Sequence, residues 1–397
     1  MFHSSCSRAK NFAYIFSCHF RRYPMSNARI RDYHITIGEL PCGPRNAITD
    51  VPGVTVGHCT IDTPEHQTGV TVVIPAPHNL FAHKLPAASY VLNGFGKTLG
   101  LVQVDELGSL ETPIALTNTL NVGLVHDALV DYTVTRCAAE NVPVRSLNPI
   151  VCECNDSGLN HITERAVTKE HVYQAIQSAS ADFEQGAIGG GRGMICYGLK
   201  GGIGSSSRVI TLDGKEYTLG ALVQSNHGRT ADLMVGQHTL GKQIMEQGGP
   251  AASQKSQTQD AHPSITAAQR SLPPIQPADL DKGSIIIIVA TDLPVSDRQL
   301  HRILKRAAVG LIRTGSHLGH GSGDIMVGFS TAYTLPADGD AEVVQVPLLN
   351  ENSIEKAFRA VAESCEEAIL NSLAAADTVV GYQGNVRYGA GVFLETL

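Results

Sequence analysis

The stretch GSIIIIVA, residues 283–290, contains the most apolar run of the chain and decides how we interpret its fold. Its apolar part, Ile285–Ala290, has six residues and is bounded by turn residues. A run of this length between turn signals is typical of a strand that is buried on both faces. We therefore expect this strand to be central to the core.

The segment upstream of this strand has the opposite character. From about Gln247 to Leu280 the chain is rich in Gln, Ser, Ala and Pro and has almost no large apolar residue. Such a composition cannot bury enough surface to order itself, so it predicts an exposed linker. The pair Gly283-Ser284 therefore stands between a movable segment and a rigid strand.

This placement indicates a bond that the chain can cut by itself. The Ser284 hydroxyl can attack the carbonyl of Gly283, take over the acyl group as an ester and release it by hydrolysis. The freed α-amine, with an ordinary pKa near ~7.7, can then act as the base for the hydroxyl of the same residue. The structural alternative is a glycine turn followed by a serine that begins a strand.

Amphipathic helices and further strands surround this segment. Ser296 and Gln299 form a capping-box pattern, after which apolar residues recur at helical spacing up to the stop at Gly315. The apolar positions of this helix are Leu300, Ile303, Leu304, Ala307, Ala308, Leu311 and Ile312. Further helices are predicted at Gly123–Tyr132, Lys169–Ser178 and Ser353–Leu373. Strands are predicted at Ala47–Ile61, Thr68–Ile74, Pro149–Cys154, Ser207–Leu212, Thr218–Ser225, Asp324–Leu335 and Val343–Pro347. Strands interleaved with such helices indicate layers of helix over sheet.

The loop HLGHGSGD, residues 317–324, offers groups that could assist a serine nucleophile. The Ser322 hydroxyl and the Asp324 carboxylate could orient Ser284 and carry protons, as the third member of a catalytic triad does. A zinc site formed by His317, His320 and Asp324 is an alternative, although the spacing is not that of a helical histidine pair. A plain polar turn is the other alternative.

Two strand ends carry further candidate residues. Asn226, in VQSNHG (223–228), is a good side-chain donor for an oxyanion, or else an ordinary turn residue. Glu153, in VCECNDSGLN (151–160), is an acid that could bind a substrate ammonium group, or else part of a solvated turn. The glycine-rich stretch at 186–204 lacks a nucleotide-binding motif, so it predicts tight turns and close packing.

Composition limits the classes of partner. The net charge of −7 and the short basic clusters argue against nucleic acid, and no apolar stretch approaches a membrane span. Nine irregularly spaced cysteines favour reduced thiols in a cytoplasmic protein. We expect no metal and no cofactor. Residues 1–24 are acid-poor and rich in Arg and Ser, which indicates either a disordered extension or a targeting segment.

The motifs together resemble the L-aminopeptidase/D-esterase family, which includes the β-aminopeptidases. The resemblance runs from about Arg29 to the C-terminus through an ordered series of motifs. These are DVPGVTVGHCTI, LTNTLNVG, ECNDSGLN, GMICYGLKGGIGSSSRV, LVQSNHG, GSIIIIVATDLPVSDRQL and GSGD. It implies an α+β fold, a four-layer αββα sandwich that is similar to the N-terminal-nucleophile hydrolases but connected differently. One domain, residues 25–397, would be cut between Gly283 and Ser284 into chains 25–283 and 284–397.

The resemblance also implies roles for single residues. Ser284 would be the nucleophile, Asn226 the oxyanion donor, and Ser322 with Asp324 the supporting pair. Glu153 would recognise the amino group of a peptide, amide or ester substrate, and the processed protomers would form a homo-oligomer. The linker is long for the family, and His227 stands where an aromatic residue is common, which we expect to bear on substrate preference.

Two alternatives to this function remain open. An acyltransferase of the ornithine acetyltransferase type would use a threonine nucleophile, and Ser284 disfavours it. A non-catalytic relative that keeps only the fold is disfavoured by the presence of Ser284, Asn226 and Asp324. The sequence leaves open whether the substrate is an α-peptide, a β-peptide, a D-amino-acid amide or an ester.

Overall fold

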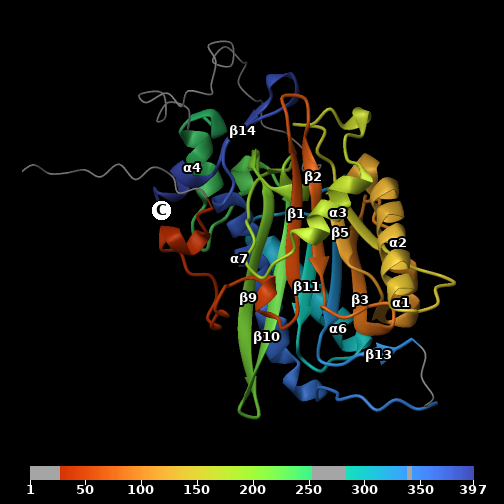
Figure 1. Cartoon of the computed structure of the whole chain (residues 1–397). Helices are drawn as coiled ribbons and strands as arrows, with labels where there is room; N and C mark the ends of the chain where they lie inside the picture. Colours follow the sequence, from red (N-terminus) through yellow and green to blue (C-terminus); the bar gives the residue numbers. More distant parts are fainter. Residues whose placement is uncertain (1–26, 253–282, 338–341) are drawn as a thin grey trace, which may run out of the picture.

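Two β-sheets lie face to face in the computed structural model, which describes residues 27–252, 283–337 and 342–397 (Figure 1). The smaller sheet has the order β1-β2-β5-β6, with strands Thr55–Asp62, Gln67–Ile74, Ile114–Asn118 and Ile150–Cys154. The larger sheet has the order β13-β3-β12-β11-β10-β9, with strands Leu335–Pro336, His83–Gly94, Gly323–Ser330, Ser284–Thr291, Lys215–Asn226 and Gly202–Leu212. Short strands complete the set: β4 (Ser109–Leu110) on β3, β7 (Ile195–Cys196) with β8 (Leu199–Lys200), and β14 (Val379–Val380) with β15 (Val386–Arg387).

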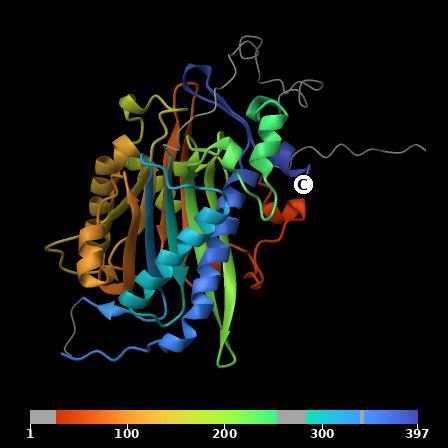
Figure 2. The ribbon, with the colours of Figure 1, turned by 180° about the vertical axis from the view of Figure 1, so that it is seen from behind.

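Helices cover the outer faces of both sheets. Helices α2 (Val122–Ala139) and α3 (Lys169–Gln177) pack on the smaller sheet. Helices α6 (Asp297–Arg313) and α7 (Glu355–Ala374) pack side by side on the larger sheet (Figure 2). The shorter helices are α1 (Leu101–Leu107), α4 (Leu240–Glu246) and α8 (Gly391–Leu394). The order of layers confirms the predicted α+β class and four-layer αββα sandwich.

Strand β11 lies inside the larger sheet, as its apolar run predicts. It pairs antiparallel with β10 and parallel with β12. Its side chains alternate between two cores: Ile286, Ile288 and Ala290 join the core between the sheets, whereas Ile285, Ile287 and Val289 join the core beneath α6 and α7. Each of the six is fully buried, and burying an isoleucine or valine contributes about 1.5–3 kcal/mol. The strand that follows the predicted cleavage site is therefore anchored on both faces.

Helix α6 confirms its predicted start and most of its apolar face. The Ser296 hydroxyl accepts a hydrogen bond from the backbone N–H of Gln299, and the Gln299 side chain completes the capping box. Ile312 is the exception, because its side chain is 53% exposed. Adjacent helical residues point in directions about 100° apart, so the inward position of Leu311 turns Ile312 towards solvent.

Several predicted strands need correction. Residues 343–347 form no strand, and all of them are exposed. Their valines have no buried face to pack, and Val343 is 78% exposed. The strand predicted from Asp324 already ends at Ser330. Strand β3 was not predicted, since its sequence HKLPAASYVLNG includes proline and two alanines, residues that are poor in strands.

Two predicted segments lie largely outside the described residues. The extension 1–24 lies wholly outside the described residues. Of the linker 247–280, only residues 247–252 are described. These six residues follow α4 and end in a 3₁₀ turn at Pro250–Ala252. Across the described ranges, none of the helices combines the length and apolarity that a membrane span requires.

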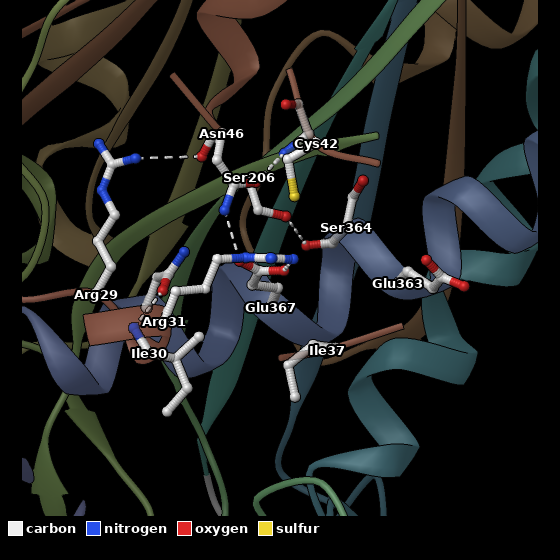
Figure 3. A network of polar contacts seen from close by, with 12 residues as sticks. Arg29, Ile30, Arg31, Ile37, Cys42, Asn46, Ser206, Glu363, Ser364 and Glu367 are labelled. Atoms are coloured by element: carbon white, nitrogen blue, oxygen red, sulfur yellow. Dashed lines mark hydrogen bonds and ion pairs between the residues drawn. The ribbon is translucent and has the colours of Figure 1, made fainter. Parts of the chain in front are cut away.

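An N-terminal segment, residues 29–46, lies against α7 (Figure 3). The Arg31 guanidinium donates to both carboxylate oxygens of Glu367, and the Asn46 side-chain amide donates to the same carboxylate. Arg208 on β9 is fully buried and pairs with Glu363 at 3.1 Å and with Glu367 at 2.7 Å. Burial raises the pKa of the Glu367 carboxyl, but Arg31 and Arg208 outweigh it and hold this pKa below its usual value. We call these five residues the Arg208 cluster.

Candidate active site

The ends of three neighbouring strands meet at one edge of the larger sheet. Asn226 is the last residue of β10 and Ser284 the first of β11, and the two are direct register partners. Asp324, near the start of β12, lies beside Ile285. Because β10 runs antiparallel to β11 whereas β12 runs parallel to it, the end of β10 and the starts of β11 and β12 share this edge. The topology thereby gathers three of the predicted site residues.

The Ser284 hydroxyl is held by a backbone donor. The N–H of Gly323 donates a hydrogen bond of 3.1 Å to its Oγ, and the Ser284 side chain is 7% exposed. Gly323 is a residue of the candidate site that the sequence interpretation missed. Its signal was its place in the GSGD motif, between two predicted site residues. A backbone N–H beside the Ser284 hydroxyl could also stabilise negative charge that develops there.

Ser322 and Asp324 form a hydrogen-bonded pair next to this contact. The Ser322 Oγ donates to Asp324 Oδ1 at 2.6 Å, and each residue is 1% exposed. A β-bulge in the pairing with β3 falls between Asp324 and Ile325, and such bulges re-aim side chains next to active sites. The structure therefore brings the pair together beside the start of β11, while their catalytic roles remain predictions.

The Asn226 side chain is oriented by backbone groups on both sides. Its Oδ1 accepts from the N–H of Ile195 at 2.8 Å, and its Nδ2 donates to the carbonyl of Asn155 at 3.1 Å. An amide nitrogen carries two protons, so the contact with Asn155 leaves a second N–H to serve an oxyanion. The amide is thus pre-organised, as an oxyanion donor must be.

Glu153 reaches the site from the smaller sheet. It lies on β6, whose last residue, Cys154, donates from Sγ to the carbonyl of Gln224 on β10 at 3.5 Å. The Gln224 side chain in turn donates to the carbonyl of Thr117 on β5 at 3.0 Å. These bonds between the sheets place the end of β6 against the end of β10. Sequence reasoning selected Glu153 as a strand-end acid but could not place its strand.

The Glu153 carboxylate is 3% exposed and bonded at both oxygens. Oε1 accepts from the backbone N–H of Lys97 at 2.8 Å, and Oε2 accepts from the Thr119 hydroxyl. A β-carbon on Gly96 would lie 3.7 Å from Oε1 and 3.8 Å from the Cα of Gly323. One point therefore lies close both to the Glu153 carboxylate and to Gly323, whose N–H binds the Ser284 hydroxyl. Lys97 and Thr119 were not predicted, although Thr119 is part of the LTNTLNVG motif.

Burial changes the titration of two neighbouring groups. Asp156 is fully buried, and this raises its pKa to about 6 despite hydrogen bonds with Thr68, Asn160 and Asn118. Burial also raises the pKa of the Cys154 thiol well above its usual value. A protonated thiol is a poor nucleophile, so Cys154 is not itself a candidate nucleophile.

The zinc alternative finds no geometric support. His317 is 68% exposed, and its Nε2 lies 3.6 Å from Asp232 Oδ2 rather than beside Asp324. Within the described residues, one set of His, Cys, Asp or Glu side chains has ligand atoms within 4.8 Å of one another, and its members are Glu65, His66 and Glu164. The Glu164 carboxylate there already pairs with His66 at 2.9 Å.

The glycine-rich stretch and His227 serve packing. A β-carbon on Gly204 would overlap the backbone carbonyl of Ala368, as the close-packing interpretation requires. His227 is 2% exposed. Its ring packs edge-on against Tyr197, with centroids 5.1 Å apart, and its Nδ1 lies 3.9 Å from the Sγ of Cys196. The effect of His227 on substrate preference remains a prediction.

Comparison with known proteins identifies the family of the chain. Residues 46–387 match the model of peptidase family S58. The β-peptidyl aminopeptidase of Sphingosinicella xenopeptidilytica is 36% identical over 378 residues, which cover 92% of this chain and 89% of that protein. The structure of a Burkholderia sp. β-aminopeptidase matches with a TM-score of 0.79 at 36% identity, covering 92% of this chain and 97% of that one.

A third comparison concerns the fold. The L-aminopeptidase D-Ala-esterase/amidase of Ochrobactrum anthropi, described as a prototype serine aminopeptidase with a variant of the Ntn hydrolase fold, matches with a TM-score of 0.78. The identity is 32%, and the match covers 91% of this chain and 95% of that one. The sandwich is accordingly of the Ntn-like type, and the chain is a hydrolase of the serine-peptidase type. It belongs to peptidase family S58.

Proposed function

We propose that this chain is an aminopeptidase that cuts itself between Gly283 and Ser284 and then uses Ser284 as its N-terminal nucleophile. It would release N-terminal residues from short peptides, amino-acid amides and esters. One observation carries the proposal: Ser284 begins a buried strand, with the N–H of Gly323 on its Oγ and Asn226 as its register partner. The same edge of the sheet also holds the Ser322–Asp324 pair.

Self-cleavage begins in the intact chain. The Ser284 Oγ attacks the carbonyl carbon of Gly283, the C–N bond breaks, and the acyl group passes to oxygen as an ester. Water then hydrolyses the ester, which leaves a carboxylate on Gly283 and an α-amine on Ser284. Intramolecular attack of this kind has a high effective concentration, so it needs no recognition of a separate substrate.

Turnover uses the same oxygen. The new α-amine takes the proton of Oγ as this atom attacks the substrate carbonyl, and the proton later passes to the leaving amine. Asn226 Nδ2 and the N–H of Gly323 stabilise the negative oxygen, while Ser322 and Asp324 relay protons and orient the nucleophile. Water releases the acyl group and regenerates Ser284.

Glu153 supplies the aminopeptidase specificity in this proposal. Its carboxylate, which lies near Gly323, would bind the free ammonium group of the substrate. Hydrolysis of free and N-acetylated amino-acid p-nitroanilides tests this, because blocking the amine should eliminate activity. Glu153→Gln should reduce the discrimination. Equal activity on both forms would exclude the role of Glu153.

The mass of the intact purified protein tests self-cleavage. We expect two fragments that meet between Gly283 and Ser284 and that stay together on gel filtration without denaturant. Ser284→Ala should leave one chain without hydrolase activity, because alanine offers no attacking oxygen. Ser284→Cys should still cut itself but act poorly on substrates. A fully active protein with one unbroken chain would rule the mechanism out.

We further propose a cytoplasmic homo-oligomer of processed protomers. The free thiols of Cys42, Cys59, Cys137, Cys152, Cys154, Cys196 and Cys365 support a reducing compartment. Light scattering that gives a monomer at micromolar concentration would contradict the assembly. Acyl transfer between amino acids, measured on the same preparation, distinguishes this enzyme from an acetyltransferase of the ornithine type.

A further inference from the structure

The carboxylate of Glu153 takes its position from two segments that are far apart in the sequence. The Lys97 N–H comes from the loop after β3, and the Thr119 hydroxyl comes from the 3₁₀ helix Thr119–Asn121 that follows β5. Each donor binds a different oxygen of the carboxylate. A carboxylate has about four acceptor positions, so each oxygen keeps one for another donor.

Thr119 itself is fixed before any substrate arrives. Strands β5 and β6 pair in parallel, with Thr117 opposite Glu153 and Asn118 opposite Cys154. Asn118 Oδ1 accepts from the backbone N–H groups of Leu120 and Asn121, both at 3.1 Å, and so caps the 3₁₀ helix. The strand pairing and this cap set where the Thr119 hydroxyl lies relative to Glu153.

A fixed donor on Oε2 matters for a group that must bind a cation. A glutamate side chain loses conformational freedom when it engages a ligand, and a pre-oriented carboxylate avoids that loss. Hydrogen bonds to an ionised group are also about twice as strong as neutral ones. The Thr119 hydroxyl thus limits the carboxylate to one orientation, with its remaining acceptor positions available to an ammonium group.

We propose that Thr119 is a positioning residue for substrate specificity, which orients Glu153 towards the free amine of the substrate. The inference rests on the proposed function, since it requires that Glu153 binds this amine. Thr119 does not touch the reacting atoms, so its effect falls on substrate binding rather than on the chemical step. Self-cleavage, which requires no amine recognition, is independent of it.

The test compares Thr119→Val with Thr119→Ser. Valine keeps the shape of threonine and removes the hydroxyl, whereas serine keeps the hydroxyl. With free amino-acid p-nitroanilides, we expect Thr119→Val to raise KM about tenfold and to leave kcat within about twofold. Thr119→Ser should restore KM, and both variants should cut themselves at the wild-type rate by mass spectrometry.

Thr117→Val is the matched control. It makes the same substitution two residues away, where the hydroxyl donates to the backbone carbonyl of Gly69 at 3.0 Å. We expect it to lower stability without changing KM. A KM that rises equally in the Thr117 and Thr119 valine variants would reveal a structural effect and overturn the inference. An unchanged KM in Thr119→Val, or a KM in Thr119→Ser as high as in Thr119→Val, would also overturn it.

Measurements on the wild-type enzyme distinguish a failure of the role of Thr119 from a failure of the proposed function on which it rests. If wild-type protein does not split, or hydrolyses N-acetylated substrates as well as free ones, the proposed function fails whatever Thr119 does. If wild-type protein splits and rejects blocked substrates while Thr119→Val behaves like wild type, only the role of Thr119 fails. If Thr119→Val does not fold, Thr119→Ala replaces it with the same expected rise in KM.

Discussion

Asn226 and Ser284 face each other as antiparallel partners across β10 and β11, so their side chains leave the larger sheet on the same face. Directly opposite residues of this kind have β-carbons about 4.5–5.5 Å apart. A slip of one residue in the register would send one of the two side chains to the other face. The fully buried strand β11 fixes the register and with it the distance between the Ser284 hydroxyl and the Asn226 amide.

Asn226→Ala should lower kcat about a hundredfold or more and leave KM nearly unchanged. The amide would act only on the negative charge that develops as Ser284 attacks, so its loss affects the transition state rather than substrate binding. Steady-state kinetics on amino-acid p-nitroanilides measure both constants. Self-cleavage should be partial at most. Wild-type turnover in this variant would show that Asn226 is not the oxyanion donor.

Gly283→Ala should slow self-cleavage about a hundredfold, which is the cost of a small misplacement of reacting atoms. A β-carbon at this position would overlap the backbone oxygen of Asn226 and the Cα of His227. The bond to be cut would therefore move away from the Ser284 hydroxyl. The fraction of uncut chain, followed by mass spectrometry after synthesis, measures the rate.

Gly123→Ala is the control for that experiment. Gly123 is exposed on α2, and a β-carbon there would meet no atom within 4 Å. Alanine also has the higher helix propensity. This variant should cut itself like wild type, and a Gly283→Ala chain that does the same would contradict the steric argument.

Arg208→Met should lower the free energy of unfolding by about 3–5 kcal/mol, because it leaves Glu363 buried without a cation and Glu367 with Arg31 alone. Urea unfolding measures this loss when the substitution is made in the Ser284→Ala chain, which we expect to remain a single polypeptide. Arg359→Met removes an ion pair with Glu39 whose side chains are 56% and 82% exposed. It should cost less than about 1 kcal/mol. Equal losses of unfolding free energy in the two variants would contradict the claim that the buried ion pairs of Arg208 matter more than the exposed pair of Arg359.

Acidification should destabilise the protein through His58. Burial lowers the pKa of His58 to about 4, with Nδ1 2.9 Å from the Thr71 hydroxyl and Nε2 3.2 Å from the Glu184 carbonyl. The unfolded chain, where the pKa is about 6.5, then binds the proton first. Stability contributed by neutral His58 is full above pH 6.5 and is lost as the pH falls towards 4, by up to about 3 kcal/mol. His58→Gln in the Ser284→Ala chain should show a smaller loss between pH 7.5 and pH 5 in urea unfolding. Identical pH profiles would dismiss His58 as the cause.

Short sequence patterns predicted those elements of the fold that are determined by interactions within a few residues. The run Ile285–Ala290 indicated a strand buried on both faces, and Ser296 with Gln299 marked the start of α6, because burial and capping act over a few residues. Residues 343–347 misled the prediction, since a group of valines does not reveal whether either face of the segment is covered. Strand β3 stayed hidden because its neighbours in the sheet, rather than its own composition, hold it extended.

The candidate site likewise has features that the sequence could predict and features that only the folded structure reveals. Ser322 and Asp324 could be paired from the sequence because they are two residues apart, and Ser284 stood out through its flanking segments. Gly323 contributes a backbone N–H, which has no signature in residue type. The contacts of Glu153 with Lys97 and Thr119 join chain positions 56 and 34 residues apart. Only the tertiary fold brings such groups together.

The Arg208 cluster falls on both sides of the proposed cut. Its cations, Arg31 and Arg208, belong to the upstream product, whereas its carboxylates, Glu363 and Glu367, belong to the downstream one. The ion pairs of these buried groups thus join residues before and after the proposed cut, so we expect neither proposed product to fold by itself. If the chain is cut as proposed, we therefore expect the polypeptide to fold as one molecule before it is cut, and we expect the two products, made separately, not to form active enzyme when they are mixed.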